Sequence, residues 1–144
     1  MPQSKGSIAT MPVYRIIYSS RPFGYDSNML NGILMQARRA NEHDDITGAL
    51  ICREDIFLQL LEGPEDKVKN TIARIRRDDR HIEVRMHVEK HVQERMFGKW
   101  AMLHDPVATW IWTPEEIDHD APARASEAEV TGFFQRLRDQ AKAD

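Results

Sequence analysis

The sequence predicts an α+β fold in which two helices cover one face of a mixed sheet and a C-terminal helix covers the other. Strand-like and helix-like hydrophobic patterns follow one another in the order β-α-β-β-α-β-β. Two of the strand-like runs are apolar at nearly every position, which is typical of a sheet that is buried on both faces. The first six elements match the ferredoxin-like arrangement, and an amphipathic segment at the end of the chain can cover the remaining sheet face.

The first strand and the first helix are separated by a loop with two chain breakers. Residues 12–19, PVYRIIYS, are β-branched and aromatic, so they indicate a strand, and Pro22 and Gly24 indicate a loop after it. Asp26 or Ser27 can cap the helix that follows, and we expect that helix to end near Asn41. Its apolar stripe has helical spacing and consists of Leu30, Ile33, Leu34 and Ala37.

A hairpin and a second helix come next. Residues 46–53, ITGALICR, and residues 56–63, IFLQLLEG, are two strands joined by a short turn at residues 54–55. Residues 63–78 predict a helix, because Pro64 suits a first helical turn and acidic residues follow it at the positive end of the helix dipole. The apolar stripe of this helix is Val68, Ile72 and Ile75.

Two further strands and a tail complete the chain. Residues 81–91 alternate, which places one set inward and the other outward, and residues 99–105 indicate a short strand with Trp100 and Met102 on one face. The expected inward set is Ile82, Val84, Met86 and Val88, and the outward set is Glu83, Arg85, His87 and Glu89. A Pro- and Asp-rich connector then leads to a helix over 126–141, which opens with the capping box Ser126…Glu129. The apolar stripe of that helix is Val130, Phe133, Phe134 and Leu137.

Composition limits the classes of protein to consider. The chain is 41% hydrophobic and 30% charged, which is typical of a globular protein, and it has no apolar run of the roughly 20 residues that cross a bilayer. Its N-terminus lacks a secretory apolar region and Cys52 is its one cysteine, so we expect a cytoplasmic protein without disulfides. A net charge of −3 argues against nucleic acid as the main partner. We expect a flexible leader over 1–11, a folded domain over 12–105 and a C-terminal helical extension over 106–144.

Gln59 is the single amide in an otherwise apolar strand, and burying it without partners would cost roughly 1–3 kcal/mol. Tyr18 at the end of the first strand can reach it, because neighbouring strands lie about 4.8 Å apart. Asn41 ends the first helix on the side that faces the sheet. A slot between the two helices would therefore have an amide end, and the charged residues at the end of the second helix would give it a basic mouth suited to phosphate. Those charged residues are Arg74, Asp78, Arg80 and His81.

Five segments, in order and spacing, resemble the BLUF family of flavin-binding blue-light sensors over roughly residues 12–104. They are YRIIYSSRP at 14–22, ANEHDDITGAL at 40–50, IFLQLLEGP at 56–64, IRRDDRH at 75–81 and FGKWAM at 97–102. The chain departs from the family at Ala40, where family members often carry a polar residue that can contact the edge of the flavin ring. The resemblance implies a light sensor that binds FAD, or occasionally FMN, and that has no enzymatic turnover.

The resemblance also implies a role for each candidate residue. Tyr18 would give an electron and a proton to the excited flavin, Gln59 would be the switching amide between Tyr18 and the ring, and Asn41 would bind the pyrimidine edge. Ile33 and Ile75 would flank the ring, and Trp100 and Met102 would carry the signal. The ribityl-phosphate end would lie against Arg74, Asp78, Arg80 and His81. Whether Gln59 rotates or tautomerises is left open by the sequence.

The resemblance implies that output passes to a separate signalling protein, with a cyclic-di-GMP phosphodiesterase and a response-regulator-like protein as the two candidates, and that the chain forms a homo-oligomer. Two other functions share the predicted topology. An acylphosphatase-like hydrolase would use Arg21 and Asn41, although the sequence lacks its glycine-rich phosphate loop. An RNA-binding module would need exposed aromatic residues on the middle strands, for which Phe57 is the one candidate.

Overall fold

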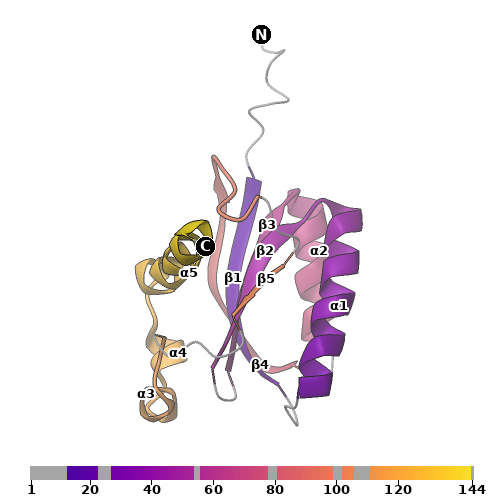
Figure 1. Ribbon diagram of the computed structural model, residues 1–144. Coiled ribbons are helices and arrows are strands. Elements are labelled where there is room, and N and C mark those ends of the chain that lie inside the picture. The colour runs from indigo at the N-terminus through magenta and orange to yellow at the C-terminus, as the bar shows by residue number, and fades with distance from the viewer. Residues whose placement is uncertain are drawn as a thin grey trace.

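Five strands form one sheet in the order β4-β1-β3-β2-β5 (Figure 1). The computed structural model describes residues 13–22, 27–53, 56–77, 81–98, 102–105 and 111–143. The four strands β1 to β4 pair antiparallel, and β5 adds to the edge of the sheet by pairing in parallel with β2. The strands are β1 Val13–Pro22, β2 Thr47–Arg53, β3 Ile56–Gly63, β4 His81–Val92 and β5 Leu103–Asp105.

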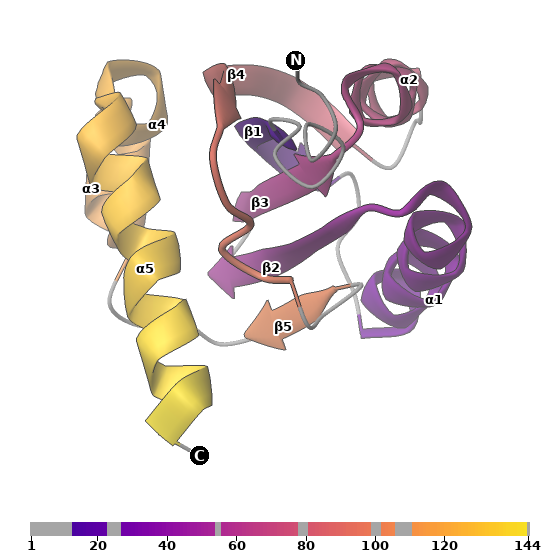
Figure 2. The same ribbon diagram turned by 90° about the horizontal axis from the view of Figure 1, so that it is seen from above.

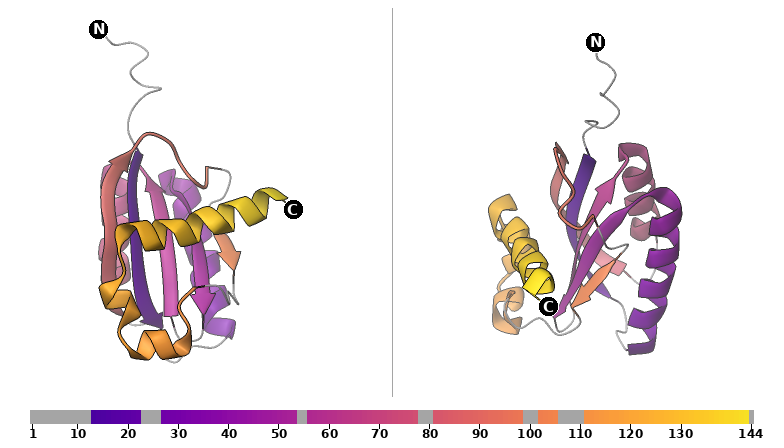
Figure 3. Two further views of the ribbon diagram at one scale, coloured as in Figure 1. Left: turned by 90° about the vertical axis from the view of Figure 1, so that its left-hand side faces the viewer. Right: turned by 45° about the horizontal axis from the view of Figure 1, so that its top comes forward.

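Helices cover both faces of this sheet. Helices α1 (Ser27–Asp44) and α2 (Glu65–Arg76) lie on one face, which we call the helix-pair face. Helices α3 (Pro114–Asp118), α4 (Ala121–Arg124) and α5 (Glu127–Ala143) lie on the opposite face, which we call the tail face, and α5 runs across the strands (Figures 2 and 3). The predicted fold class, with two helices on one side and the C-terminal extension on the other, is confirmed.

Strand β3 explains why both faces had to be covered, because all eight of its residues are buried. Phe57 and Leu61 point to the core under the helix pair, whereas Leu58 and Leu60 point to the core under the tail. This is the alternation that a strand imposes on its side chains. Gly48 in β2 faces the backbone of β3 so closely that a Cβ atom there would collide with the Leu60 carbonyl, which accounts for glycine at that position.

The tail face is sealed mainly by aromatic and aliphatic side chains from the extension. Phe134 of α5 is fully buried and packs edge-on against Phe97, with ring centroids 6.1 Å apart. Trp112 packs edge-on against Phe133 at 5.5 Å, and Val130 and Leu137 are buried beside them. Each buried side chain of this size stabilises the fold by about 1.5–3 kcal/mol, so the extension is part of the hydrophobic core of the sheet.

Several predicted boundaries need correction. Strand β1 continues through Pro22 at the edge of the predicted loop, and α1 continues past Asn41 to Asp44. The connector after residue 106 contains two short helices that we did not predict. The first of them has a complete capping box, in which Thr113 and Glu116 bind each other's backbone N–H groups, followed by Pro114 at its first position. The predicted cap of the last helix is confirmed in part, since the Ser126 hydroxyl accepts from the Glu129 amide at 3.1 Å.

The predicted clean alternation of β4 is wrong. Ile17 pairs with Val88 but the next residue, Tyr18, pairs with Met86, so His87 is an extra residue that forms a β-bulge. As a result Val88 lies in the core of the tail face, while Met86 packs on the opposite side, under the helix pair. A second register shift lies further along the strand.

His87 at the bulge faces the tail and is not exposed as predicted. Its Nε2 lies 2.9 Å from the Ser19 hydroxyl, and its ring lies 6.2 Å from that of Trp112. Burial, and then the positive charge of Arg85, lower the pKa of His87 from its ordinary value. The neutral form of His87 is therefore favoured in the folded chain.

A buried ion pair joins β1 and β3 on the tail face. The Arg15 guanidinium lies 2.7 Å from the Glu62 carboxylate, whose side chain is 0% exposed. Glu62 also accepts from the backbone amides of Met96 and Phe97, at 2.8 Å and 3.1 Å, and Arg15 donates to the Glu94 carbonyl at 3.3 Å. The pair thus anchors residues 94–97, which carry Phe97 into the core.

Candidate functional site

Tyr18 and Gln59 are brought together at the centre of the sheet. They are directly opposite each other in the antiparallel pairing of β1 with β3, and both side chains point to the helix-pair face. Tyr18 is fully buried and Gln59 is 5% exposed. The Tyr18 hydroxyl donates a hydrogen bond to Gln59 Oε1. The odd amide in β3 therefore has a buried polar partner, as its position in the sequence required.

The other end of the Gln59 amide is directed at Met102. Gln59 Nε2 lies 3.5 Å from Met102 Sδ, and Met102 is 3% exposed just before β5. A thioether is a weak hydrogen-bond acceptor, and an amide nitrogen carries two N–H donors. Among the residues that the structure describes, one of these donors points to a weak acceptor and the other has no acceptor. The amide therefore retains the capacity to donate to a further group on this face.

Asn41 lies on α1 and is the second buried amide on the helix-pair face. It is 2% exposed, and its backbone carbonyl accepts from the Ile46 amide at 2.8 Å, where the chain leaves the helix for β2. Two amides and a phenol on one covered face are donors and acceptors suited to the polar edge of a flat heterocycle. The donor set therefore fits the pyrimidine edge of a flavin.

Helix α2 contributes Ile75 and Arg74. Ile75 is partly buried and packs against the core under the helix pair. Arg74 is more exposed, donates to the Thr71 hydroxyl at 3.2 Å, and lies 3.9 Å from the Asp44 carboxylate at the end of α1. A hydrogen bond from His43 lowers the pKa of Asp44; burial opposes this, and the charges of Lys67, His43 and Arg74 add to the lowering. Arg74 thus lies where the ends of the two helices approach each other.

The structure does not describe the side chains of the remaining predicted site residues. Asp78, Arg80 and Trp100 are not described, and for Ile33 and His81 the backbone is described but the side chain is not. Their predicted roles stay predictions. In the described ranges no group of three or more His, Cys, Asp or Glu side chains is placed to hold a metal ion. The same ranges contain no helix that is long and apolar enough to span a membrane.

Two functional alternatives lose support from this geometry. Phe57, the aromatic residue that an RNA-binding surface would need, is fully buried under the helix pair. Arg21, which a hydrolase would place in a phosphate loop, lies within β1 and is 3.6 Å from Glu83. Neither residue is placed for the chemistry that those alternatives require.

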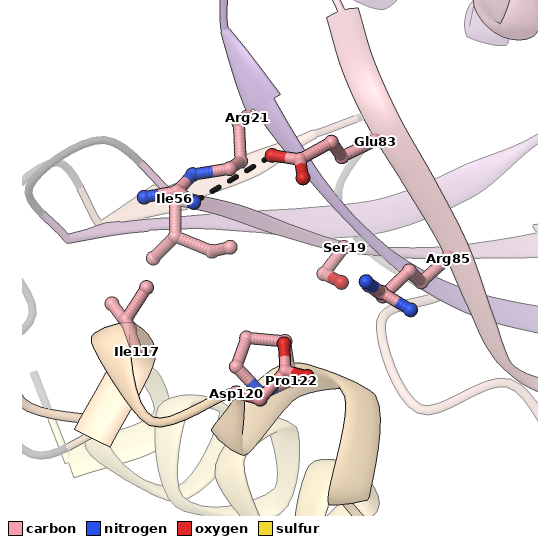
Figure 4. Close-up of a pocket in the computed structure, with 8 residues that line it drawn as sticks. All are labelled: Ser19, Arg21, Ile56, Glu83, Arg85, Ile117, Asp120 and Pro122. Carbon is pink, nitrogen blue, oxygen red and sulfur yellow. Dashed lines mark ion pairs between the residues drawn. The ribbon is translucent and has the colours of Figure 1, made fainter.

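A hollow lies on the tail face, between the sheet and helices α3 and α4 (Figure 4). Its cavity volume is about 30 Å³, and it contains the Arg21–Glu83 ion pair together with apolar side chains such as Ile117 and Pro122. Arg85 and Asp120 add one further charge of each sign, so the lining is electrically balanced. None of the predicted flavin-site residues lines this hollow. We interpret it as a gap in the packing of the extension on the sheet.

The sequence indicated the tyrosine and the two amides, but it did not reveal what holds Met102. Arg38 on α1 donates to the Met102 carbonyl from Nε at 3.3 Å and from Nη2 at 3.1 Å. In the sequence Arg38 is one of two adjacent arginines, Arg38 and Arg39, on a helix, with nothing to distinguish it from a solvated charge.

Comparison with known proteins shows that most of this chain matches a known family. The family model of "Sensors of blue-light using FAD" matches residues 13–103. The photoactivated adenylate cyclase subunit beta of Euglena gracilis is 39% identical over 74 residues, which are 51% of this chain and 9% of that protein. The blue light- and temperature-regulated antirepressor of Escherichia coli K12 is 39% identical over 66 residues, or 46% of this chain and 16% of that protein.

A solved structure supports the fold over nearly the whole chain. The dark-state structure of BlrB matches with a TM-score of 0.73 and 21% identity, and the match covers 90% of this chain and 97% of that one. The sequence matches above, by contrast, span only a small part of the two curated relatives. The activities of the unmatched parts of those relatives are therefore properties of those proteins and not of this chain.

Proposed function

Since this chain belongs to the BLUF family of blue-light sensors that use flavin, we propose that it binds FAD between α1 and α2 and reports light to a separate partner protein. The observation that carries the proposal is the buried series Tyr18–Gln59–Met102, in which one amide has a different neighbour at each end. FAD is favoured over FMN because the family description specifies FAD.

The proposed binding residues follow from where they lie. Gln59 and Asn41 hold the pyrimidine edge, because both are buried amides on the helix-pair face. Ile75 and Ile33 flank the ring from the two helices. Arg74 lies where the helix ends approach each other and binds the ribityl-phosphate end, which requires it to loosen its long contact with Asp44. The predicted partners of Arg74 in that role are Asp78, Arg80 and His81.

The chemistry of the switch is carried by three side chains. When bound, FAD would supply the absorption of blue light and an acceptor for both the electron and the proton. Tyr18 is the proposed electron and proton donor, since its hydroxyl is already hydrogen-bonded to Gln59. An amide has a donor end and an acceptor end, so Gln59 can adopt two hydrogen-bond arrangements in one cavity. A change of arrangement at Gln59, by rotation or by tautomerisation, changes the hydrogen-bonding group that faces Met102 and thereby alters the contact next to β5.

Gln59→Leu tests this proposal directly. The wild-type protein should purify yellow and shift its flavin absorption to the red under blue light. The variant should still bind flavin, because leucine keeps approximately the same volume, but it should lose the red shift, because both hydrogen-bonding ends are gone. Absorption spectra before and after illumination measure both properties.

The matched control is Leu61→Met, which changes a buried side chain on the same strand and face without touching the amide. A red shift of normal size in Gln59→Leu would exclude Gln59 as the switch. A wild-type protein that stays colourless with added FAD would exclude the sensor function itself.

We further propose that the extension carries the output, without catalytic turnover in this chain. Met102 directly precedes β5, and the proposed near-flavin pair, Trp100 and Met102, leads along the chain through β5 into the extension, residues 106–144. Helix α5 exposes Glu129, Arg136 and Asp139 around its buried stripe, which gives a partner a charged surface to recognise. Proximity and chain continuity support this route.

The names of the two curated relatives join light sensing to a cyclase and to an antirepressor, which supports a signalling role for this chain too. The proposed partner is a cyclic-di-GMP phosphodiesterase or a response-regulator-like protein, and the chain is proposed to act as a homo-oligomer.

Light should change the hydrogen exchange of the extension. We expect amides within residues 102–105 and 111–143 to exchange at least about threefold faster or slower in the light, because a local opening free energy that changes by less than 1 kcal/mol already has that effect. Mass spectrometry of the FAD-loaded protein, in the dark and under steady illumination, measures the difference. The Tyr18→Phe protein is the control that receives the same light. If exchange were equal in dark and light while a partner still responded to light, the extension would not carry the output. The output surface would then be assigned to α1 and α2.

A further inference from the structure

Met102 is held at two points, one on its side chain and one on its backbone. Its Sδ lies 3.5 Å from Gln59 Nε2 inside the core. Its carbonyl oxygen accepts two hydrogen bonds from Arg38, from Nε at 3.3 Å and from Nη2 at 3.1 Å. A single residue therefore connects the solvent-facing side of α1 with the buried amide of the switch.

The side-chain contact is too weak to fix Met102 by itself. A thioether sulfur is a weak acceptor, and methionine has three rotatable bonds, so it adapts to whatever space is left to it. The position of its sulfur therefore follows the position of its backbone.

The backbone near Met102 has few other restraints in the sheet. Strand β5 consists of three residues at the edge and pairs with one neighbour, β2, from Ala49↔Leu103 to Ile51↔Asp105. Met102 precedes the first of these pairs, so the ladder does not include it. The guanidinium of Arg38 restrains the backbone at this residue.

We propose that Arg38 is a positioning residue of the light switch. By clamping the Met102 carbonyl it keeps the sulfur opposite the amide nitrogen of Gln59, and it thereby favours the dark arrangement, in which the amide oxygen faces Tyr18. This inference rests on the proposed function, because a preferred orientation of Gln59 matters only if the amide switches. In the described ranges Arg38 contacts neither Tyr18 nor Gln59 directly, and it acts through its hydrogen bonds to the Met102 carbonyl.

The chain offers matched variants for the test. Arg38→Gln removes the charge and the two-pronged donor, and Arg38→Lys keeps the charge but presents a single flexible ammonium group in place of the planar fork. Arg39 is the adjacent residue on the same helix, is exposed, and makes no hydrogen bond or ion pair with any residue in the described ranges. Arg39→Gln therefore makes the same change of charge without touching Met102.

The first measurement is the methyl NMR spectrum of the FAD-loaded protein in the dark, with methionine methyl groups labelled and Met102→Leu used to assign the Met102 signal. In Arg38→Gln the Met102 signal should shift or broaden, because the sulfur then samples several positions. In Arg39→Gln it should stay where it is in the wild type, and Arg38→Lys should lie between the two.

The second measurement is the rate of return from the red-shifted state in darkness. Since the clamp stabilises the dark arrangement, its loss should slow the return by roughly three- to tenfold, the effect of one net hydrogen bond. Arg39→Gln should recover at the wild-type rate.

Each outcome decides the proposal. A wild-type Met102 signal and a wild-type recovery rate in Arg38→Gln would overturn the positioning role, while a normal red shift in the wild type would leave the sensor function intact. If the wild type showed no red shift, the sensor function would fail, and so would any role of Arg38 in it, although the NMR comparison would still report whether Arg38 fixes Met102. If Arg38→Gln did not fold, Arg38→Lys would carry the same two measurements.

Discussion

Tyr18→Phe should abolish the light-induced red shift and leave flavin bound. Phenylalanine fills the same buried space at the centre of β1, so the packing under α1 and α2 is kept. The variant loses the hydroxyl that donates to Gln59 Oε1. Without it, the Gln59 amide loses the hydroxyl that donates to its oxygen and the proposed proton donor. Flash illumination with absorption spectroscopy measures the loss, and the flavin-to-protein absorbance ratio shows that binding is kept.

Tyr14→Phe is the matched control. Tyr14 lies on the same strand and points to the same face, but its ring packs edge-on against His91, with centroids 5.1 Å apart. Removal of its hydroxyl should leave the red shift unchanged. A normal photocycle in Tyr18→Phe, or an equal loss in both variants, would exclude Tyr18 as the specific donor.

Glu62→Ala should have the largest effect on folding. It leaves the Arg15 guanidinium buried without its carboxylate and removes the acceptor of the Met96 and Phe97 amides. Removal of one partner of a buried ion pair costs about 3–5 kcal/mol in the free energy of unfolding. For a chain of this size we expect the melting temperature to fall by roughly 6–20 °C. Urea unfolding followed by circular dichroism measures the free energy.

The control for Glu62 is an exposed ion pair on the same side of the molecule. Glu127→Ala breaks the pair between Lys90 and Glu127, both about half exposed, and exposed pairs contribute little to stability. The paired replacement Arg15→Met with Glu62→Leu should recover much of the loss, because apolar residues can replace a buried ion pair at little cost. Equal destabilisation by Glu62→Ala and Glu127→Ala would show that burial of the Arg15–Glu62 pair is not what stabilises this region.

The sequence was sufficient to predict the sheet, the helix pair and three buried polar residues on the helix-pair face, Tyr18, Gln59 and Asn41. Hydrophobic periodicity identifies each element, and an amide in an apolar strand such as Gln59 is visible because it breaks that periodicity. Glu62 could not be assigned in the same way. It ends a strand next to a glycine, as surface acids often do, and its partner Arg15 is distant in sequence. Its other partners are backbone amides, which carry no sequence signature.

Arg38 escaped prediction for a related reason. A side chain that binds a backbone carbonyl requires only that the carbonyl be nearby, whatever residue carries it. In contrast, the short helix α3 could have been predicted, because Thr113 and Glu116 form a capping box around Pro114. The bulge at His87 could not, since hydrophobic residues recur at every second position on both sides of it, and only the pairing with β1 reveals the shift.

That bulge gives the sheet unequal mechanical compliance around Tyr18. Toward β3, Tyr18 lies in a ladder of seven consecutive pairs without a register shift. Toward β4, its pairing is interrupted on both sides, between Ile17 and Tyr18 and between Ser19 and Arg21. A bulge leaves one residue outside the ladder and weakens the local cross-strand restraint. A small displacement of β1 at Tyr18 therefore meets a stiff neighbour on one side and a soft one on the other. The deformation is expected at His87, whose ring lies 6.2 Å from that of Trp112, so the sheet has a bending point beside Tyr18, the proposed electron and proton donor.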